Sequence, residues 1–135
     1  MSSLYIRSYA KLNLYLKVLG RRKDNYHSIV TLFERIGLYD GLNLKSRPDN
    51  RIKITSDDQR LPCGQSNLAY RAASLLKKDL KIDKGLEIRI EKRIPIASGL
   101  GGGSSDAAGV LLGLNRRHVD HPRADFLLRQ AVCRR

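Results

Sequence analysis

Cysteine and long apolar runs are both scarce in this chain. Its 135 residues include two cysteines, Cys63 and Cys133, whose spacing fits no metal-binding or CxxC motif. We therefore expect both to be reduced thiols. No apolar run reaches the length of a membrane span, and the amino terminus has no signal-peptide core. These absences predict a cytoplasmic protein that makes no membrane contact.

Acidic side chains are also scarce. There are 13 Asp and Glu against 26 Lys and Arg, which gives a formal net charge of +13. A basic surface favours anionic partners, whether nucleotides or nucleic acid. No basic run is interleaved with aromatic residues as in a single-strand-binding face, so nucleic acid is the less favoured partner. Most of these charges are interpreted as a solvated surface that aids solubility.

The order of periodic segments predicts an α+β fold, with helices packed on one face of a mixed sheet. The length suits one domain with a real core. Over residues 4–19, alternation places Leu12, Leu14, Leu16 and Val18 on one face, which we expect to be buried. Gly41 is expected to end a second strand. The remaining strands are expected at 27–38, 42–44, 52–54 and 86–94. Helices are expected at 67–80, capped by Ser66, and at 104–115.

Residues 95–106 read PIASGLGGGSSD and run directly into an apolar helical pattern. Glycines allow close backbone approach, and the first N–H groups of a helix attract anions, so this loop predicts a phosphate site. Ser104 and Ser105 could cap the helix or reach a phosphate or its metal. The loop lacks the Lys of a Walker A motif and the third glycine of the dinucleotide fingerprint. A flexible linker is the alternative, but linkers rarely separate a clean strand from such a helix.

Three motifs resemble the GHMP kinase superfamily and, within it, the family of 4-diphosphocytidyl-2-C-methyl-D-erythritol kinases. They are Tyr-Ala-Lys-Leu-Asn-Leu at 9–14, Asn-Tyr-His-Ser at 25–28 with Thr-Leu-Phe at 31–33, and the glycine loop at 94–108. The resemblance covers residues 4 to about 115. It implies a small-molecule kinase that uses ATP to phosphorylate the substrate's 2-hydroxyl in non-mevalonate isoprenoid biosynthesis. The chemistry of phosphoryl transfer predicts Mg²⁺ as a cofactor.

The resemblance also implies roles for individual residues. Lys11 would lie beside the acceptor hydroxyl as the catalytic lysine, and Asn13 would hold the methylerythritol part. Tyr26 and His27 would form the cytidine pocket. Asn67 would border the adenine, and the ATP phosphates would lie on Pro95, Ile96, Ala97, Ser98, Gly99, Leu100, Gly101, Gly102, Gly103, Ser104 and Ser105. No protein ligand for Mg²⁺ can be named from the sequence.

Each of these residues also has an ordinary structural interpretation. Lys11 could be a solvated strand lysine, His27 a surface residue in a turn, and Asn13 an outward polar side chain. Asp106 falls in the first helical turn, where a carboxylate suits the helix dipole. We interpret Asp106 as structural and not as the catalytic base.

The family pattern stops near residue 115, which divides the chain into a kinase-like domain at 1–115 and an atypical basic tail at 116–135. The family's Gly-Ala-Asp segment, which carries the catalytic base, and its second domain are absent. The tail could be an amphipathic helix that contacts membrane or nucleic acid, or a frameshifted or truncated end. We expect an inactive nucleotide-binding fragment that self-associates through exposed apolar surface. A kinase completed by another chain and a basic nucleic-acid-binding module are the alternatives.

Overall fold

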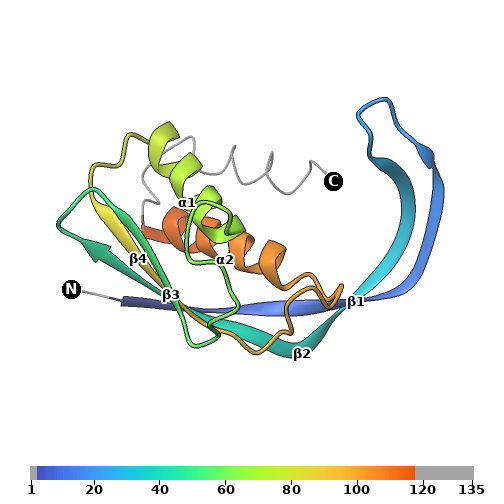
Figure 1. The fold of residues 1–135 in the computed structure, drawn as a ribbon, viewed down its shortest axis with the longest axis horizontal. Coiled ribbons are helices and arrows are strands. Elements are labelled where there is room, and N and C mark those ends of the chain that lie inside the picture. Colours follow the sequence, from blue (N-terminus) through green and yellow to red (C-terminus); the bar gives the residue numbers. More distant parts are fainter. Residues whose placement is uncertain (1–2, 118–135) are drawn as a thin grey trace.

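A computed structural model of the protein describes residues 3–117 as one four-stranded sheet and two helices (Figure 1). The strand order is β1-β2-β4-β3, with β3 and β4 parallel and the other neighbours antiparallel. The predicted α+β fold on a mixed sheet is confirmed. Cys133 and the expected tail helix lie outside the described residues. The elements are β1 Ser3–Arg21, β2 His27–Arg47, β3 Ile52–Ser56, α1 Leu68–Asp79, β4 Gly85–Glu91 and α2 Gly102–Arg117.

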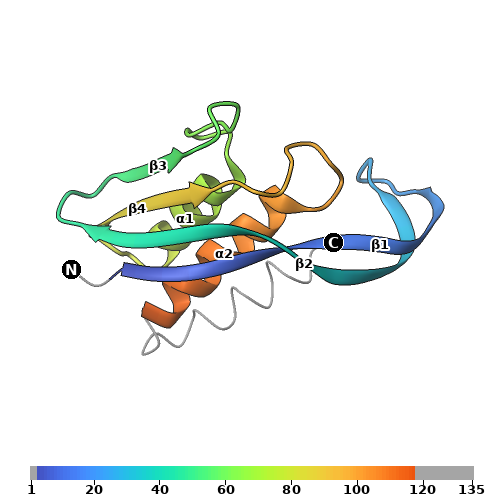
Figure 2. The ribbon, with the colours of Figure 1, turned by 90° about the horizontal axis from the view of Figure 1, so that it is seen from below.

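Both helices cover the same face of the sheet, and the core lies between the two layers (Figures 1 and 2). In β4, the residues from Leu86 to Ile90 alternate as predicted, with the even-numbered side chains buried and the others facing out. Helix α2 packs very close to the sheet at Gly109, which has no side chain. A Cβ at this position would lie only 2.6 Å from Leu42 Cδ1. The buried core includes Leu42, Leu44, Ile54, Ala69, Ala73, Leu76, Ile88, Val110 and Leu114.

Strand β2 runs without interruption through Gly41, so the prediction that this glycine ends a strand is wrong. Gly41 pairs with Arg7 of β1 on one side and with Glu91 of β4 on the other. A Cβ at this position would lie 2.5 Å from the hydroxyl oxygen of Tyr5. The glycine therefore allows a side chain of the neighbouring strand to lie across the sheet, and it does not break the strand.

The outer halves of β1 and β2 extend beyond the sheet as a two-stranded arm, which pairs from Lys11–Arg35 to Arg21–His27. Figure 1 shows this arm curling toward the side on which the helices lie. The side chains expected to be buried, Leu12, Leu14, Leu16 and Val18, are 45–59% exposed. That prediction is wrong because these side chains lie on the arm, which extends beyond the described layers whose contact forms the core (Figure 1). A register shift between Asn13 and Tyr15 also interrupts the alternation.

Helix α1 is capped by Asn67 and not by Ser66, which corrects the expected cap. The Asn67 Oδ1 accepts the Ala69 N–H at 2.8 Å, and its Nδ2 donates to the Pro62 carbonyl at 2.7 Å. Both ends of the amide are therefore used to hold the loop before α1 against the start of the helix. Neither helix in the described part of the chain is long and apolar enough to cross a membrane.

Candidate phosphate-binding site

The glycine loop connects β4 to α2 and reverses the chain at one end of the sheet (Figure 2). Ala97, Gly99 and Gly101 have φ values of 58°, 76° and 75°. Glycine adopts this left-handed region without a steric cost, whereas Ala97 is strained there. Because two of the three positive-φ positions are glycines, the loop can turn sharply and still present bare backbone at the start of the helix.

Helix α2 begins at Gly102, two residues earlier than predicted. The N–H groups of its first residues have no acceptor within the helix, and Gly101 before them has no side chain that could cap them. The first turn contains no acidic residue. This helix end is therefore suited to an anion, since its N–H groups and the helix dipole both favour negative charge.

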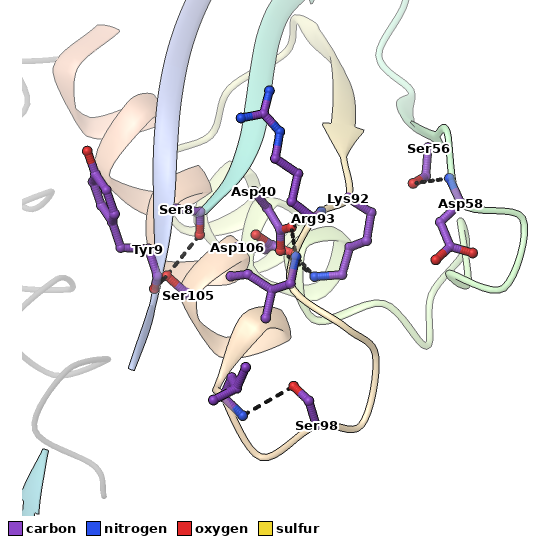
Figure 3. Close-up of polar contacts among 12 residues, drawn as sticks. Ser8, Tyr9, Asp40, Ser56, Asp58, Lys92, Arg93, Ser98, Ser105 and Asp106 are labelled. Carbon is purple, nitrogen blue, oxygen red and sulfur yellow. Dashed lines mark hydrogen bonds and ion pairs between the residues drawn. The ribbon is translucent and has the colours of Figure 1, made fainter. Parts of the chain in front are cut away.

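Ser104 and Ser105 lie inside α2, so neither caps the helix as expected. The Ser105 hydroxyl donates to the Tyr9 carbonyl at 2.7 Å and accepts from the Ser8 hydroxyl at 2.9 Å. These bonds attach the first turns of α2 to β1 (Figure 3). Ser105 is thus engaged in positioning the helix.

A cavity of about 340 Å³ lies against the loop. Of the predicted phosphate-loop residues, all but Leu100 and Ser105 line this cavity. Asn67 does not line it and is buried as a helix cap, and its contact with adenine stays a prediction. The lining also includes three residues that sequence reasoning missed, namely Leu61, Leu68 and Lys92. The sequence did contain an indication for Lys92. Ile88, Ile90 and residue 92 alternate on the buried side of the strand, where an apolar residue is expected.

Lys11 is brought directly against the loop. Its backbone N–H donates to the Leu100 carbonyl at 2.9 Å, and its ammonium donates to the Gly99 carbonyl at 3.0 Å. The same ammonium also donates to the Asn13 Oδ1, and the Asn13 Nδ2 in turn donates to Thr31 Oγ1 at 2.8 Å. Lys11 is therefore a partly buried, hydrogen-bonded lysine and not a freely solvated one. The catalytic role of Lys11 and the substrate contact of Asn13 stay predictions.

Tyr26 lies in the turn between β1 and β2, and His27 is the first residue of β2. Figure 1 shows this turn at the far end of the arm, apart from the glycine loop. The Tyr26 side chain is 74% exposed, and the turn before it is closed by the Arg22 N–H donating to the Tyr26 carbonyl at 2.6 Å. Asn25 reaches a φ of 65° in this turn. The described residues do not bring Tyr26 and His27 into contact with Lys11, so their part in a base pocket stays a prediction.

Beneath the loop lies a buried cluster of three charges, formed by Asp40, Lys92 and Asp106 (Figure 3). The Lys92 ammonium forms an ion pair with Asp40 Oδ2 and lies 3.6 Å from Asp106 Oδ2, and all three side chains are at most 4% exposed. Burial, with the nearby Asp40 carboxylate, raises the pKa of Asp106 to about 6, while Lys92 and Ser8 oppose the rise. Asp106 Oδ1 has no hydrogen-bond partner in the described structure. The structural interpretation of Asp106 agrees with this burial, since its carboxylate is sealed away from the cavity lining.

Known proteins resemble this chain in sequence. Residues 67–131 match the family model for the GHMP kinases N terminal domain. The chain is 46% identical over 115 residues to the 4-diphosphocytidyl-2-C-methyl-D-erythritol kinase of Alkaliphilus metalliredigens, covering 85% of the chain and 40% of that relative. It is 53% identical over 106 residues to the kinase of the same name from Syntrophotalea carbinolica, covering 78% and 38%. The chain belongs to the GHMP kinase family.

Solved structures agree with this GHMP kinase assignment. A crystal structure of 4-(cytidine 5'-diphospho)-2C-methyl-D-erythritol kinase superposes with a TM-score of 0.75 at 39% identity, covering 95% of this chain and 46% of that one. The mevalonate kinase of Methanococcus jannaschii, at 15% identity and a TM-score of 0.65, shares the fold. This GHMP kinase chain spans about 40% of the length of the curated relatives that it matches. The family match extends past residue 115, and the domain boundary placed there stays a prediction.

A metal ion in this GHMP kinase domain would depend mainly on the nucleotide. Between residues 3 and 117, no three His, Cys, Asp or Glu side chains group as a metal site. Mg²⁺ commonly binds through substrate phosphates and water with only one or two carboxylates, so such a set is not required.

A larger, open hollow of about 630 Å³ beside α1 is lined by Lys77 and Lys78 but lies apart from the loop. The Lys77 ammonium there already donates to Asn50 Oδ1 at 2.8 Å.

Proposed function

We propose that this chain is the nucleotide-binding part of an ATP-dependent kinase that phosphorylates the 2-hydroxyl of 4-diphosphocytidyl-2-C-methyl-D-erythritol in non-mevalonate isoprenoid biosynthesis. The observation that carries the proposal is Lys11 lying hydrogen-bonded against the glycine loop at the open start of α2. The names of relatives at 46–53% identity support the substrate. A cytoplasmic location is part of the proposal, since reduced thiols such as the exposed Cys63 are typical of the cytosol.

The residues present supply positioning and charge stabilisation, which are what phosphoryl transfer chiefly needs. The free N–H groups at the start of α2 would hold the ATP phosphates, and Mg²⁺ would supply positive charge that offsets the charge of those phosphates. Lys11 would stabilise negative charge that develops near the acceptor hydroxyl. Asn13 would orient the methylerythritol part, and Tyr26 with His27 would hold the cytosine base.

The chain by itself is proposed to be catalytically inactive. Its relatives are more than twice as long, and none of the described carboxylates lies beside Lys11 as a base for the acceptor hydroxyl. Asp106, the carboxylate closest to the loop in sequence, is buried behind the loop. We therefore expect ATP binding without turnover from this chain alone.

Replacing Gly101 with Val tests the nucleotide site. We expect at least a tenfold loss of ATP affinity in calorimetry, because Gly101 has a φ of 75° and a Cβ there would lie 3.2 Å from Lys11 Cγ. Gly64→Ala is the matched control, because nothing lies within 4 Å of its Cβ position, and its ATP affinity should be unchanged. Replacing Gly103 as well should deepen the loss. Absence of ATP binding to the unsubstituted chain, or normal binding by Gly101→Val, would contradict the proposal.

One observation favours nucleic-acid binding as a second candidate function. Tyrosines and arginines of β1 and β2 lie together with Arg93, which follows β4. Arg35 lies over the Tyr9 ring at 4.7 Å, and Arg7 and Arg93 lie over the Tyr39 ring at 5.1 and 4.8 Å. Such a mixture can stack bases and attract phosphates. RNA binding that falls steeply with salt and ignores Gly101→Val would favour this candidate. The guanidinium groups already occupy these ring faces, so we rank it second.

Self-association through the arm is a further part of the proposal. The arm exposes Leu16 at 55% and Phe33 at 60%, among other large apolar side chains. We expect the purified chain to form dimers or larger species in sedimentation velocity, and we expect Leu16→Lys with Phe33→Lys to shift it toward monomer. Leu75→Lys is the control, because Leu75 is 68% exposed on α1, away from the arm. A clean monomer at high concentration would count against this proposal.

A further inference from the structure

The buried cluster of Asp40, Lys92 and Asp106 connects both ends of the glycine loop to the sheet. At the loop's entrance, Asp40 Oδ1 on β2 accepts the backbone N–H groups of Arg93 and Ile94 at 2.6 and 2.8 Å. These are the two residues immediately before Pro95. One carboxylate oxygen on a neighbouring strand therefore fixes the place where the chain leaves β4 and enters the loop.

The second oxygen of the same carboxylate fixes the loop's exit through Lys92. Asp40 Oδ2 accepts from the Lys92 ammonium, which lies 3.6 Å from Asp106 Oδ2 on α2. A Cβ added to Gly102 would stand 2.9 Å from that ammonium, so the charge lies directly beside the first residue of the helix. The side chain of Lys92 thus spans from the end of β4 to the start of α2, behind the loop backbone.

The cluster is costly to bury, which calls for an explanation beyond packing. Three ionisable side chains sit at most 4% exposed with an excess of one carboxylate, and one oxygen of Asp106 has no partner. Buried ion pairs rarely add net stability compared with apolar side chains of similar volume. They do fix geometry, because charge-assisted hydrogen bonds are short and directional.

We propose that Lys92 is a positioning residue for the phosphate site, holding the start of α2 and the entrance of the glycine loop at a fixed separation through Asp40 and Asp106. This inference rests on the proposed nucleotide-binding function. Lys92 acts through the backbone of the loop: it lines the cavity, but its ammonium is already committed to the two carboxylates. A change in the cluster should therefore lower the affinity for the phosphates and leave the contacts to the nucleoside unchanged.

The test compares the affinities of Mg²⁺-ATP and adenosine for the full chain by calorimetry and competition. Lys92→Met alone would leave two buried carboxylates facing each other and could fail to fold. The double variant Lys92→Met/Asp106→Asn keeps the cluster's net charge at −1, because one positive and one negative charge are removed together. We expect it to bind ATP at least tenfold more weakly and adenosine as the unsubstituted chain does.

One control separates positioning from general damage: Lys53→Met removes a surface lysine whose ammonium lies 4.0 Å from Glu87, and it should change neither affinity. Asp106→Asn keeps the Lys92–Asp40 pair but weakens the link to α2, so it should give a smaller loss that is again selective for ATP. If the double variant does not fold, Asp40→Asn repeats the test. It keeps an acceptor for the Arg93 and Ile94 N–H groups but points an amide at the Lys92 ammonium, so the same selective loss of ATP affinity is expected.

The outcomes distinguish this inference from the proposed function. An unsubstituted chain that binds neither ligand would refute the nucleotide-binding function and the inference with it. A chain that binds ATP normally, with the ratio of ATP to adenosine affinity unchanged in the variants, would refute only the positioning role of Lys92. An equal loss for both ligands would also refute it, because that result indicates general damage to the cavity.

Discussion

Replacing Lys11 with Ala is expected to lower phosphoryl transfer by at least about 100-fold in a chimaera that supplies the remainder of the enzyme. The chimaera joins residues 1–115 to the following segment of the Alkaliphilus metalliredigens kinase, which is 46% identical over 115 residues. The physical reason is that the Lys11 ammonium is held at the loop, 3.0 Å from the Gly99 carbonyl. In the proposed mechanism, charge that develops at the acceptor oxygen would lose the cation that Lys11 supplies.

The loss should fall on kcat more than on ATP affinity. In the proposed function, the start of α2 would hold the phosphates through backbone groups that the substitution does not remove. Lys17→Ala is the matched control, because Lys17 lies on the same strand but is exposed on the arm, and its activity should stay within a factor of two or so of the parent. A Lys11→Ala chimaera with nearly full kcat would exclude Lys11 from the chemical step.

Much of the fold follows from periodicity that can be seen in the sequence. The alternation around Ile88 and Ile90 predicts a half-buried strand because β4 is covered by helices on one face only. The glycine loop is predicted for the same local reason: special backbone geometry needs glycine at Gly99 and Gly101, and both have positive φ. Local rules succeed where the determining neighbours are close in sequence.

The predictions that were wrong concern what covers a strand. Leu14 and Leu16 alternate as in any half-buried strand, but burial depends on whether another layer reaches them, and the described part of the chain has none there. Glycine is common where strands end, but the role of Gly41 is set by the Tyr5 side chain on the partner strand. Periodicity identifies the apolar face of a strand, and only the arrangement of elements in space decides what lies against it.

Local sequence patterns likewise predict one part of the candidate site and miss another. Lys11 and the loop were found because both belong to local motifs, and the fold brings them together by hydrogen bonds. The pairing of Asp40 with Lys92 depends on the register between β2 and β4, which no local pattern specifies. The sequence indicated only that Lys92 falls on the buried side of the strand, where a charged residue requires a buried partner.

Replacing Asp106 with Asn is expected to change how stability depends on pH. The pKa of Asp106 is raised from 3.8 to about 6, because burial and then the Asp40 carboxylate disfavour its ionised form. In the native state this group therefore holds its proton more tightly than in the unfolded chain. Its contribution is fully present below pH 3.8 and is lost as pH rises through about 6. At pH 7 the ionised carboxylate costs about 2 to 3 kcal/mol, at 1.36 kcal/mol per pKa unit.

The measurement is the free energy of unfolding from urea titrations between pH 4 and 7, compared between the chain and its Asp106→Asn variant. We expect the unsubstituted chain to lose about 2 to 3 kcal/mol relative to the variant across this window. The window stops at pH 4 because Asp49 and Asp58, whose pKa values are lowered to about 2 by Arg47 and Arg60, act with the opposite sign in more acid solution. Parallel curves for the two proteins would show that the Lys92 ammonium fully compensates the Asp106 carboxylate. The buried cluster would then carry its net charge of −1 without a cost to stability between pH 4 and 7.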